Sequence, residues 1–223
     1  MVSLIKGALT AANPNYQANI YRTEPHPIMK NFASAVYLDS YSKTTAEFVI
    51  NNGVYLTITS ADPEFMLYLY NGLMKKRRYE YREYQLYVQN VQVSSTPVIK
   101  REKAIFRTLS PIVLRKRNSN RYLDLEEAEY QETLNYMANL ILLDTVHRSL
   151  KEPITLIPLD MQKRIVPLKH EQHFKGLKNQ TLFVSGYIGD FVLEGNPEDL
   201  TILAASGLGH RRNEMFGAIR ELG

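Results

Sequence analysis

The residues best suited to chemistry lie near the N-terminus, in the segment "YRTEPHPIMKNF". His26 stands between Pro25 and Pro27, which hold the backbone extended and fix the direction of an exposed imidazole. Histidine titrates near neutral pH and can therefore take up a proton during a reaction. Lys30 follows four residues later and can offset negative charge on a reacting group. Tyr21 can orient a ligand or share the role of acid. The alternative interpretation is a surface histidine in a rigid bend, beside a lysine and a tyrosine without function.

A second candidate site is the glycine-rich segment "GLGHRRNEMFG" at residues 207–217. We expect Gly207 and Gly209 to let backbone N–H groups approach phosphates, which Arg211 and Arg212 neutralise and His210 contacts. A dinucleotide fingerprint is excluded because its third glycine would fall on Arg212. A P-loop is excluded because no Gly-Lys-Ser/Thr follows. The alternative is a helix C-cap followed by an ordinary loop.

Two basic runs could also contact a polyanion. The run "KKRRYEYREY" ends a predicted helix, where cations interact favourably with the helix dipole and need no ligand. The run "RKRNSNR" is harder to explain as a cap, so we expect it to grip a nucleic-acid backbone through Arg115, Lys116, Arg117 and Arg121. His170 and His173 would point to opposite faces of a strand, with no cysteine or carboxylate cluster beside them. The sequence therefore predicts no metal site and no cofactor.

Composition limits the class of protein. The chain has 223 residues, a formal charge of +4 and no cysteine. Its pI near 9.1 favours polyanionic partners mildly. The absence of cysteine excludes disulfides and suits a reducing compartment. No apolar run approaches the ~20 residues of a membrane-spanning helix, and the first residues lack the pattern of a signal peptide. We expect a soluble, cytoplasmic protein with no membrane contact.

The hydrophobic pattern predicts two successive series of elements. The first reads helix, strand, strand, helix, strand over residues 2–13, 32–41, 46–60, 61–76 and 84–95. The second reads strand, helix, strand, strand, helix, strand over residues 103–117, 123–150, 164–174, 181–195, 196–206 and 215–222. Asn196 is the expected N-cap of the last helix, Pro197 its first residue and Gly207 its C-cap.

The second series is the order of a split βαβ, or ferredoxin-like, unit. The first has the same order without its opening strand. We therefore predict an α+β protein with tandem ferredoxin-like (RRM-like) domains at residues 1–98 and 99–223. A ferredoxin-like unit begins on a strand, so we expect either a start upstream of Met1 or a first domain that is built differently.

Three segments carry a resemblance to a known family: "GNPEDLTILAASGLGHRRNEMFGAIREL", "FRTLSPIVLRKR" and "LFVSGYIGDFVLEGNPEDL". In order and spacing they resemble the CRISPR-associated endoribonucleases that process repeat RNA, the Cas six family. The chain departs from the family at Met215, where a glycine is usual.

The resemblance implies metal-independent cutting of precursor RNA by 2′-OH attack, which leaves a 2′,3′-cyclic phosphate and yields guide crRNAs for antiviral defence. His26 would then be the general base, Lys30 would sit by the scissile phosphate and Tyr21 would position RNA. The implied partner is CRISPR repeat RNA, with other Cas effector subunits and a homodimer as open alternatives. A catalytically inactive CRISPR RNA-binding or scaffold protein, or an unrelated tandem RNA-binding protein, would fit the same residues.

Overall fold

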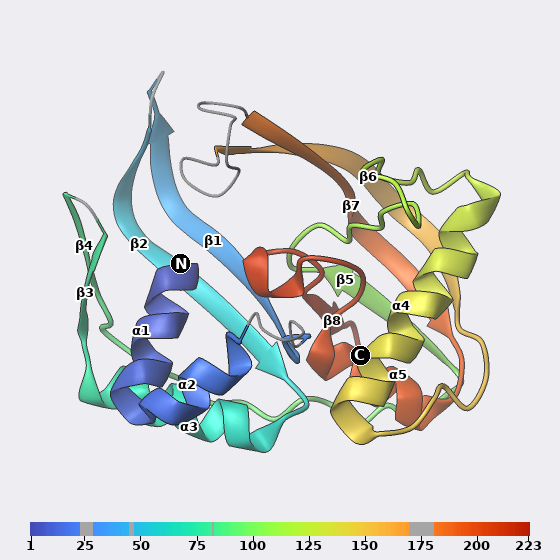
Figure 1. The fold of residues 1–223 in the computed structure, drawn as a ribbon. Coiled ribbons are helices and arrows are strands. Elements are labelled where there is room, and N and C mark those ends of the chain that lie inside the picture. The colour runs from blue at the N-terminus through green and yellow to red at the C-terminus, as the bar shows by residue number, and fades with distance from the viewer. Residues whose placement is uncertain (23–28, 45–46, 82, 170–180) are drawn as a thin grey trace.

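The computed structural model describes residues 1–22, 29–44, 47–81, 83–169 and 181–223. Helices α1, α2 and α3 gather beside a long two-stranded ribbon in the first half of the chain (Figure 1). In the second half, α4 and α5 lie in front of a four-stranded sheet. The two halves meet where the glycine-rich segment (residues 207–217) passes beside the ribbon, so this segment of the second half contacts the first half.

The second half has the predicted order of elements. It consists of β5 (Lys103–Thr108), α4 (Ala128–Val146), β6 (Thr155–Lys169), β7 (Thr181–Glu194), α5 (Pro197–Ser206), the 3₁₀ turn η1 (Arg212–Glu214) and β8 (Ile219–Glu221). The strands pair in the order β6-β7-β5-β8, and every pairing is antiparallel. This is the strand order that a βαββαβ unit adopts when both of its helices cross one face of the sheet, so the ferredoxin-like prediction is confirmed.

The first half also follows the predicted order, with one additional helix and one additional strand. It consists of α1 (Val2–Ala12), α2 (Pro14–Ile20), β1 (Phe32–Lys43), β2 (Phe48–Ser60), α3 (Pro63–Lys75), β3 (Arg78–Tyr81) and β4 (Tyr84–Tyr87). Asn13 ends α1, as expected before a proline, but its side chain then caps α2 by accepting the Tyr16 N–H. The described part of this half has no strand before α1. The division at residues 98 and 99 stays a prediction.

Three predicted strands are shorter than the pattern suggested, and the last of them, expected over residues 215–222, covers only Ile219–Glu221. The strand expected over residues 103–117 ends at Thr108, because Pro111 has no N–H to donate and Ser110 uses its hydroxyl instead. The Ser110 hydroxyl accepts the Ala218 N–H and donates to the Ser34 carbonyl, both at 3.0 Å. The strand expected over 84–95 ends at Tyr87. β6, in contrast, begins at Thr155, well before the predicted start.

Each half has its own apolar core. In the first, α1 and α3 pack on the ribbon, where the rings of Phe32 and Phe65 stack 4.6 Å apart. In the second, α4 and α5 cover the sheet, where Phe106 and Phe191 stack 5.8 Å apart. Such stacking adds to the free energy that burial of the rings provides.

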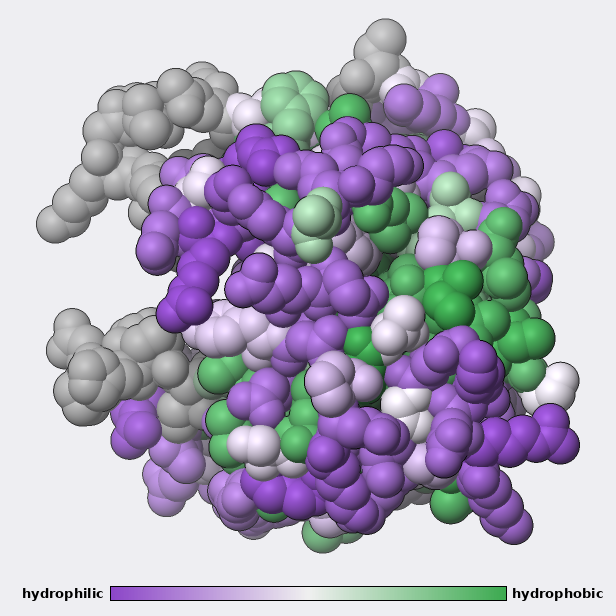
Figure 2. Space-filling model, turned by 90° about the vertical axis from the view of Figure 1, so that its right-hand side faces the viewer, coloured by the Kyte–Doolittle hydropathy of each residue, from purple (hydrophilic) through white to green (hydrophobic). Residues whose placement is uncertain are grey.

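The hydropathy of the surface differs from one side of the molecule to another. Figure 2 shows the face on the right of Figure 1, where hydrophilic residues dominate and apolar residues gather toward one edge. On the side of the sheet away from the helices, Ile105, Val192 and Ile157 form a row across three paired strands. None of the helices formed by described residues is long and apolar enough to cross a membrane.

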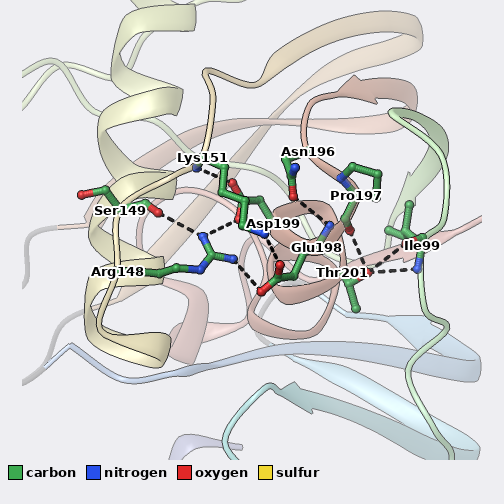
Figure 3. A network of polar contacts seen from close by, with 9 residues as sticks. All are labelled: Ile99, Arg148, Ser149, Lys151, Asn196, Pro197, Glu198, Asp199 and Thr201. Carbon is green, nitrogen blue, oxygen red and sulfur yellow. Dashed lines mark hydrogen bonds and ion pairs between the residues drawn. The ribbon is translucent and has the colours of Figure 1, made fainter.

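A buried carboxylate fastens α5 to the segment that follows α4 (Figure 3). Asp199 is fully buried, pairs with the Arg148 guanidinium at 2.6 Å and accepts the Lys151 N–H at 2.7 Å. Asn196 caps the same helix by accepting the Glu198 N–H, and Pro197 is its first residue, as predicted. The negative charge of Asp199 lies in the first turn, where the helix dipole favours it.

We predict that Asp199→Ala lowers the free energy of unfolding by about 3 kcal/mol, because the Arg148 charge and the Lys151 N–H lose a buried partner. Urea unfolding followed by circular dichroism measures the change. Glu198→Gln is the matched control, since Glu198 lies in the same turn but its side chain is 58% exposed. Equal unfolding midpoints for Asp199→Ala and Glu198→Gln would contradict the assigned role.

Candidate RNA interface

The glycine-rich segment (residues 207–217) is the C-cap of α5 followed by a tight turn. Gly207, Gly209 and Gly217 all have positive φ angles, of 79°, 78° and 69°. Arg211 and Met215 share this left-handed backbone, with φ angles of 59° and 68°. Met215 therefore holds a conformation that favours glycine, the residue usual there in the resembling family, at a cost of about 1 kcal/mol. Its side chain packs against the core of the first half.

The glycines are required by close backbone packing. A Cβ at Gly207 would lie 2.5 Å from the Ala33 Cβ, and one at Gly217 would lie 2.1 Å from the Leu208 carbonyl oxygen. At Gly209 it would lie 2.5 Å from the Val113 carbonyl oxygen. Each contact is shorter than carbon and oxygen atoms tolerate. The absence of side chains thus lets three stretches of backbone touch: β1, residues 111–114 and the segment itself.

Several amides of the segment are used internally. The Gly207 N–H donates to Leu203, Leu208 N–H to Gly217 and His210 N–H to Val113, at 2.8 Å each. The Gly217 N–H donates to Pro111, also at 2.8 Å. The Gly207 N–H therefore completes the end of α5, and an approach of phosphate to the backbone around Gly207 and Gly209 stays a prediction.

The two arginines of the segment have different surroundings. Arg212 is 4% exposed, and its guanidinium donates to the Ser206 carbonyl at 2.5 Å. Burial lowers its pKa to about 10, opposed by Asp144, so it stays charged inside the protein. Its burial does not fit the predicted contact with phosphate. Arg211 is half-buried and pairs with Glu214 at 2.5 Å, which leaves it at the surface of the segment.

His210 is mostly buried beside these cations. Burial lowers its pKa to about 4, and Arg115, Arg211 and Arg212 add to the shift. Its Nδ1 atom is buried and has no hydrogen-bond partner among the residues that the structure describes. At neutral pH the imidazole is uncharged, so His210 can offer a ligand a neutral hydrogen bond rather than a cation.

Tyr21 and Lys30, each predicted as a site residue, come together next to the same segment. The Lys30 Nζ lies 5.2 Å from the centre of the Tyr21 ring, and the Lys6 Nζ lies 4.5 Å from it. Burial and the Lys6 charge lower the pKa of Lys30, while Glu214 raises it. Burial raises the pKa of Tyr21 to about 12. Two ammonium groups and a tyrosine therefore adjoin η1 of the glycine-rich segment.

Lys6 and Glu214 were not among the predicted site residues. Lys6 is the one charged residue in "VSLIKGALTAA", an otherwise apolar helix, and Glu214 is the one acid in "GLGHRRNEMFG". Each is the only residue of its sign of charge in its segment, which is the only signal that the sequence offered. Lys30 also lines a cleft of about 470 Å³ between α2, α3 and the end of α4.

The predicted basic run lies in another place, near the start of α4. Two of its cations have acidic partners there: Lys116 pairs with Glu129 at 2.7 Å, and Arg121 makes two hydrogen bonds of 2.6 Å to Glu127. Arg117 lies 5.0 Å over the Tyr136 ring. Arg115 is exposed and close enough to His210 to influence its pKa. Of this run, Arg115 is the residue that the structure brings to the glycine-rich segment.

His26, His170 and His173 lie outside the described residues. Within the described ranges, no three histidine or acidic side chains come together as a metal site would require.

Comparisons with known proteins identify the family. The family model for "CRISPR associated protein Cas6, C-terminal" matches residues 94–221, more than half of the chain. The chain therefore belongs to the Cas6 family. A search of curated protein sequences found no match.

Solved structures share the fold over nearly the whole chain. A Cas6-related protein from Pyrococcus furiosus superposes with a TM-score of 0.78 at 15% identity, covering 99% of this chain and 88% of that one. A structure entitled "An RAMP protein binding different RNA substrates" gives 0.77 at 15% identity, covering 100% and 90%. A Cas6 product complex gives 0.61 at 16% identity, covering 99% and 92%. At these identities the similarity establishes the fold alone.

We predict that Gly207→Ala lowers the free energy of unfolding by about 1–3 kcal/mol, because the new Cβ meets Ala33 and the φ angle is left-handed. Thermal and urea unfolding measure the loss. Gly53→Ala is the matched control, since nothing lies within 4 Å of a Cβ there, and it should change stability by less than about 0.5 kcal/mol. A stable Gly207→Ala variant would show that the close packing is dispensable.

The lowered pKa of His210 predicts a dependence of stability on pH. The unfolded chain binds a proton near pH 6.5, and the folded chain binds it only near pH 4. The free energy of unfolding should thus fall by about 2–3 kcal/mol as pH drops through this window. In His210→Asn the fall should be smaller, as measured by urea unfolding at several pH values. His147→Asn, at an exposed histidine with φ 56°, is the control and should keep the wild-type dependence.

Proposed function

We propose that this chain is a metal-independent endoribonuclease that binds CRISPR repeat RNA and cuts the precursor transcript into guide crRNAs. Membership of the Cas6 family, whose members process repeat RNA, supports the proposal at the level of the family. One observation supports it at the level of residues. The glycine-rich segment brings Arg211 and Glu214 to the place where Tyr21, Lys30 and Lys6 meet, so RNA-binding and reactive groups adjoin.

The proposed reaction is an attack by a ribose 2′-OH on the phosphorus of the adjacent phosphodiester. A base takes the 2′ proton, the 2′ oxygen bonds to phosphorus and the bond to the 5′ oxygen breaks. A proton is then delivered to the leaving 5′ oxygen. The products are a 2′,3′-cyclic phosphate and a 5′-OH end, and the reaction consumes no water or metal.

We assign the role of general base to His26. A general base in this reaction must titrate near neutral pH, and it contributes about 10²–10⁴-fold in rate. Lys30 neutralises charge that builds on the phosphate. The pKa of Lys30 is lowered by burial and Lys6, which makes its ammonium a better proton donor than an ordinary lysine. Burial raises the pKa of Tyr21 to about 12, so it stays protonated. Its hydroxyl is buried, so Tyr21 positions the RNA through the Lys6 and Lys30 ammonium groups that lie over its ring.

The RNA backbone is proposed to run over the exposed side of the glycine-rich segment. Arg211 and Arg115 supply its positive charge, and neutral His210 contributes a hydrogen bond. Gly207 and Gly209 shape this surface, while Arg212 supports it from inside. Lys116, Arg117 and Arg121 lie further away, near the start of α4. To bind RNA, these three side chains must leave their partners Glu129, Tyr136 and Glu127 and contact phosphates instead. Contacts with other Cas subunits, and a homodimer, stay predictions.

The proposed function makes a prediction about RNA cleavage. Wild-type protein should cut end-labelled repeat RNA in excess EDTA, and a single 2′-deoxy at the cut site should abolish the reaction. His26→Ala should lose about 10²–10⁴-fold in single-turnover rate, and Lys30→Ala should also be slowed. Lys75→Ala, an exposed lysine on the last turn of α3, is the control and should cut normally.

The alternative function is RNA binding without cutting. Tight binding of repeat RNA by wild type, with no cleavage under any condition, would identify the chain as an inactive CRISPR RNA-binding or scaffold subunit. Absence of a preference for repeat RNA over unrelated hairpins would contradict both functions.

The proposed function also makes a prediction about the salt dependence of RNA binding. Arg115→Ala should weaken binding and reduce the slope of log K against log salt by about 0.7–0.9, the value for one lost phosphate contact. Arg121→Ala should reduce it less, because Glu127 already holds that guanidinium in two hydrogen bonds. Fluorescence anisotropy at several salt concentrations measures both slopes. A larger change for Arg121→Ala would place the RNA over the start of α4 instead.

A further inference from the structure

The ribbon of β1 and β2 exposes aromatic side chains that no core uses. Tyr37 and Tyr55 are 65% and 60% exposed, and Tyr41 and Phe48 are each 52% exposed. Tyrosine and phenylalanine usually bury more of their surface than this, so four such rings on one ribbon indicate a binding surface.

The rings form two pairs across the strands. Tyr37 lies opposite Tyr55 in the ladder, with the ring centres 6.1 Å apart. Beyond the register shift at Ser40, the Tyr41 ring packs edge-on against Phe48 at 5.4 Å. The Lys43 ammonium lies 5.9 Å from the centre of the Phe48 ring. Each pair holds its rings in place but leaves more than half of their surface uncovered.

The Tyr37–Tyr55 pair is on the same side of the ribbon as the residues that pack against Gly207 and Ala218. Side chains alternate between the two sides of a strand, so Ala33, Ala35 and Tyr37 share one side. Ala33 and Ala35 pack against Ala218, and Ala33 is the residue that Gly207 approaches. Tyr37 is four residues further along β1, about 13 Å from Ala33. The aromatic surface thus continues directly from the contact between the two halves.

We propose that the Tyr37–Tyr55 pair and the Tyr41–Phe48 pair stack unpaired bases of the bound RNA. The inference rests on the proposed RNA-binding function and adds to it a second site, which recognises bases where the glycine-rich segment recognises phosphates. Exposed aromatic rings bind single-stranded RNA in this way, because every base has a flat apolar face.

The composition of the surface favours RNA over a protein partner. Three of the four rings are tyrosines, whose hydroxyls stay hydrated while the ring faces stack, and Lys43 supplies a cation for the backbone beside them. β1 also carries Ser34, which bonds to Arg212 of the glycine-rich segment, so one strand of RNA reaches both this segment and the rings.

The test compares two fluorescein-labelled probes: a 12-nucleotide oligoadenylate RNA and an abasic ribose-phosphate chain of the same length. Wild type should bind the oligoadenylate at least about tenfold more tightly, since each stacked base contributes measurably. Tyr37→Ala/Tyr55→Ala should lose this preference and keep its affinity for the abasic chain. Tyr37→Phe/Tyr55→Phe retains the rings and should retain the preference.

Tyr70→Ala is the matched control, because Tyr70 is exposed on α3 rather than on the ribbon, and it should bind both probes as wild type does. Crosslinking of 5-iodouridine RNA to the ribbon tyrosines, mapped by mass spectrometry, gives a readout that does not depend on affinity. A crosslink to Tyr37 or Tyr55 supports the proposal.

Three outcomes would overturn it. An unchanged base preference in Tyr37→Ala/Tyr55→Ala, with weaker binding in Arg115→Ala, would refute stacking but leave RNA binding intact. Conversion of a dimer to a monomer by the double variant, with RNA affinity unchanged, would make the ribbon a protein interface. Failure of wild type to bind either probe or cut repeat RNA would refute the proposed function together with this inference.

Discussion

The contact between the backbone of the glycine-rich segment and β1 is the constraint on which the rest of the molecule depends. Gly207 and Gly217 bring the end of α5 against Ala33 and Ser34, and an isolated parallel bridge joins Ser34 to Gly217. Ser110 completes the junction, because its hydroxyl bonds to both Ser34 and Ala218. Since the junction is made largely of backbone and small side chains, it tolerates little change in the distance between the two halves.

The position of the candidate site follows from this junction. Once residues 207–217 are fixed against β1, the turn η1 must lie beside α1 and the end of α2. Glu214 then influences Lys30, and Met215 packs on the core that includes Tyr21. The charged Arg212 side chain inside the segment bonds to Ser206 and keeps the turn in shape. Groups from four separate parts of the sequence meet because one short segment is held rigidly.

The sequence predicted the features that depend on local patterns. The order of elements in the second half, most of the order in the first half and the caps of α5 follow from periodicity and from proline, asparagine and glycine signals. It did not predict features that depend on contacts between distant residues. Arg212 and Arg211 are adjacent and look alike in sequence, but only the packed structure buries one of them. The glycines suggested phosphate binding, whereas their close contacts are with Ala33 and Val113.

The junction also has a consequence for the order in which the chain folds during synthesis. Ser34 and Arg212 are 178 residues apart in sequence and share a hydrogen bond. A ribosome releases Ala33 and Ala35 long before it makes the residues that cover them. Contacts so distant in sequence form late, because a long loop must close first. The first half therefore spends most of translation with Ala33 and Ala35 uncovered, and it attains its final packing only when the last elements of the chain emerge.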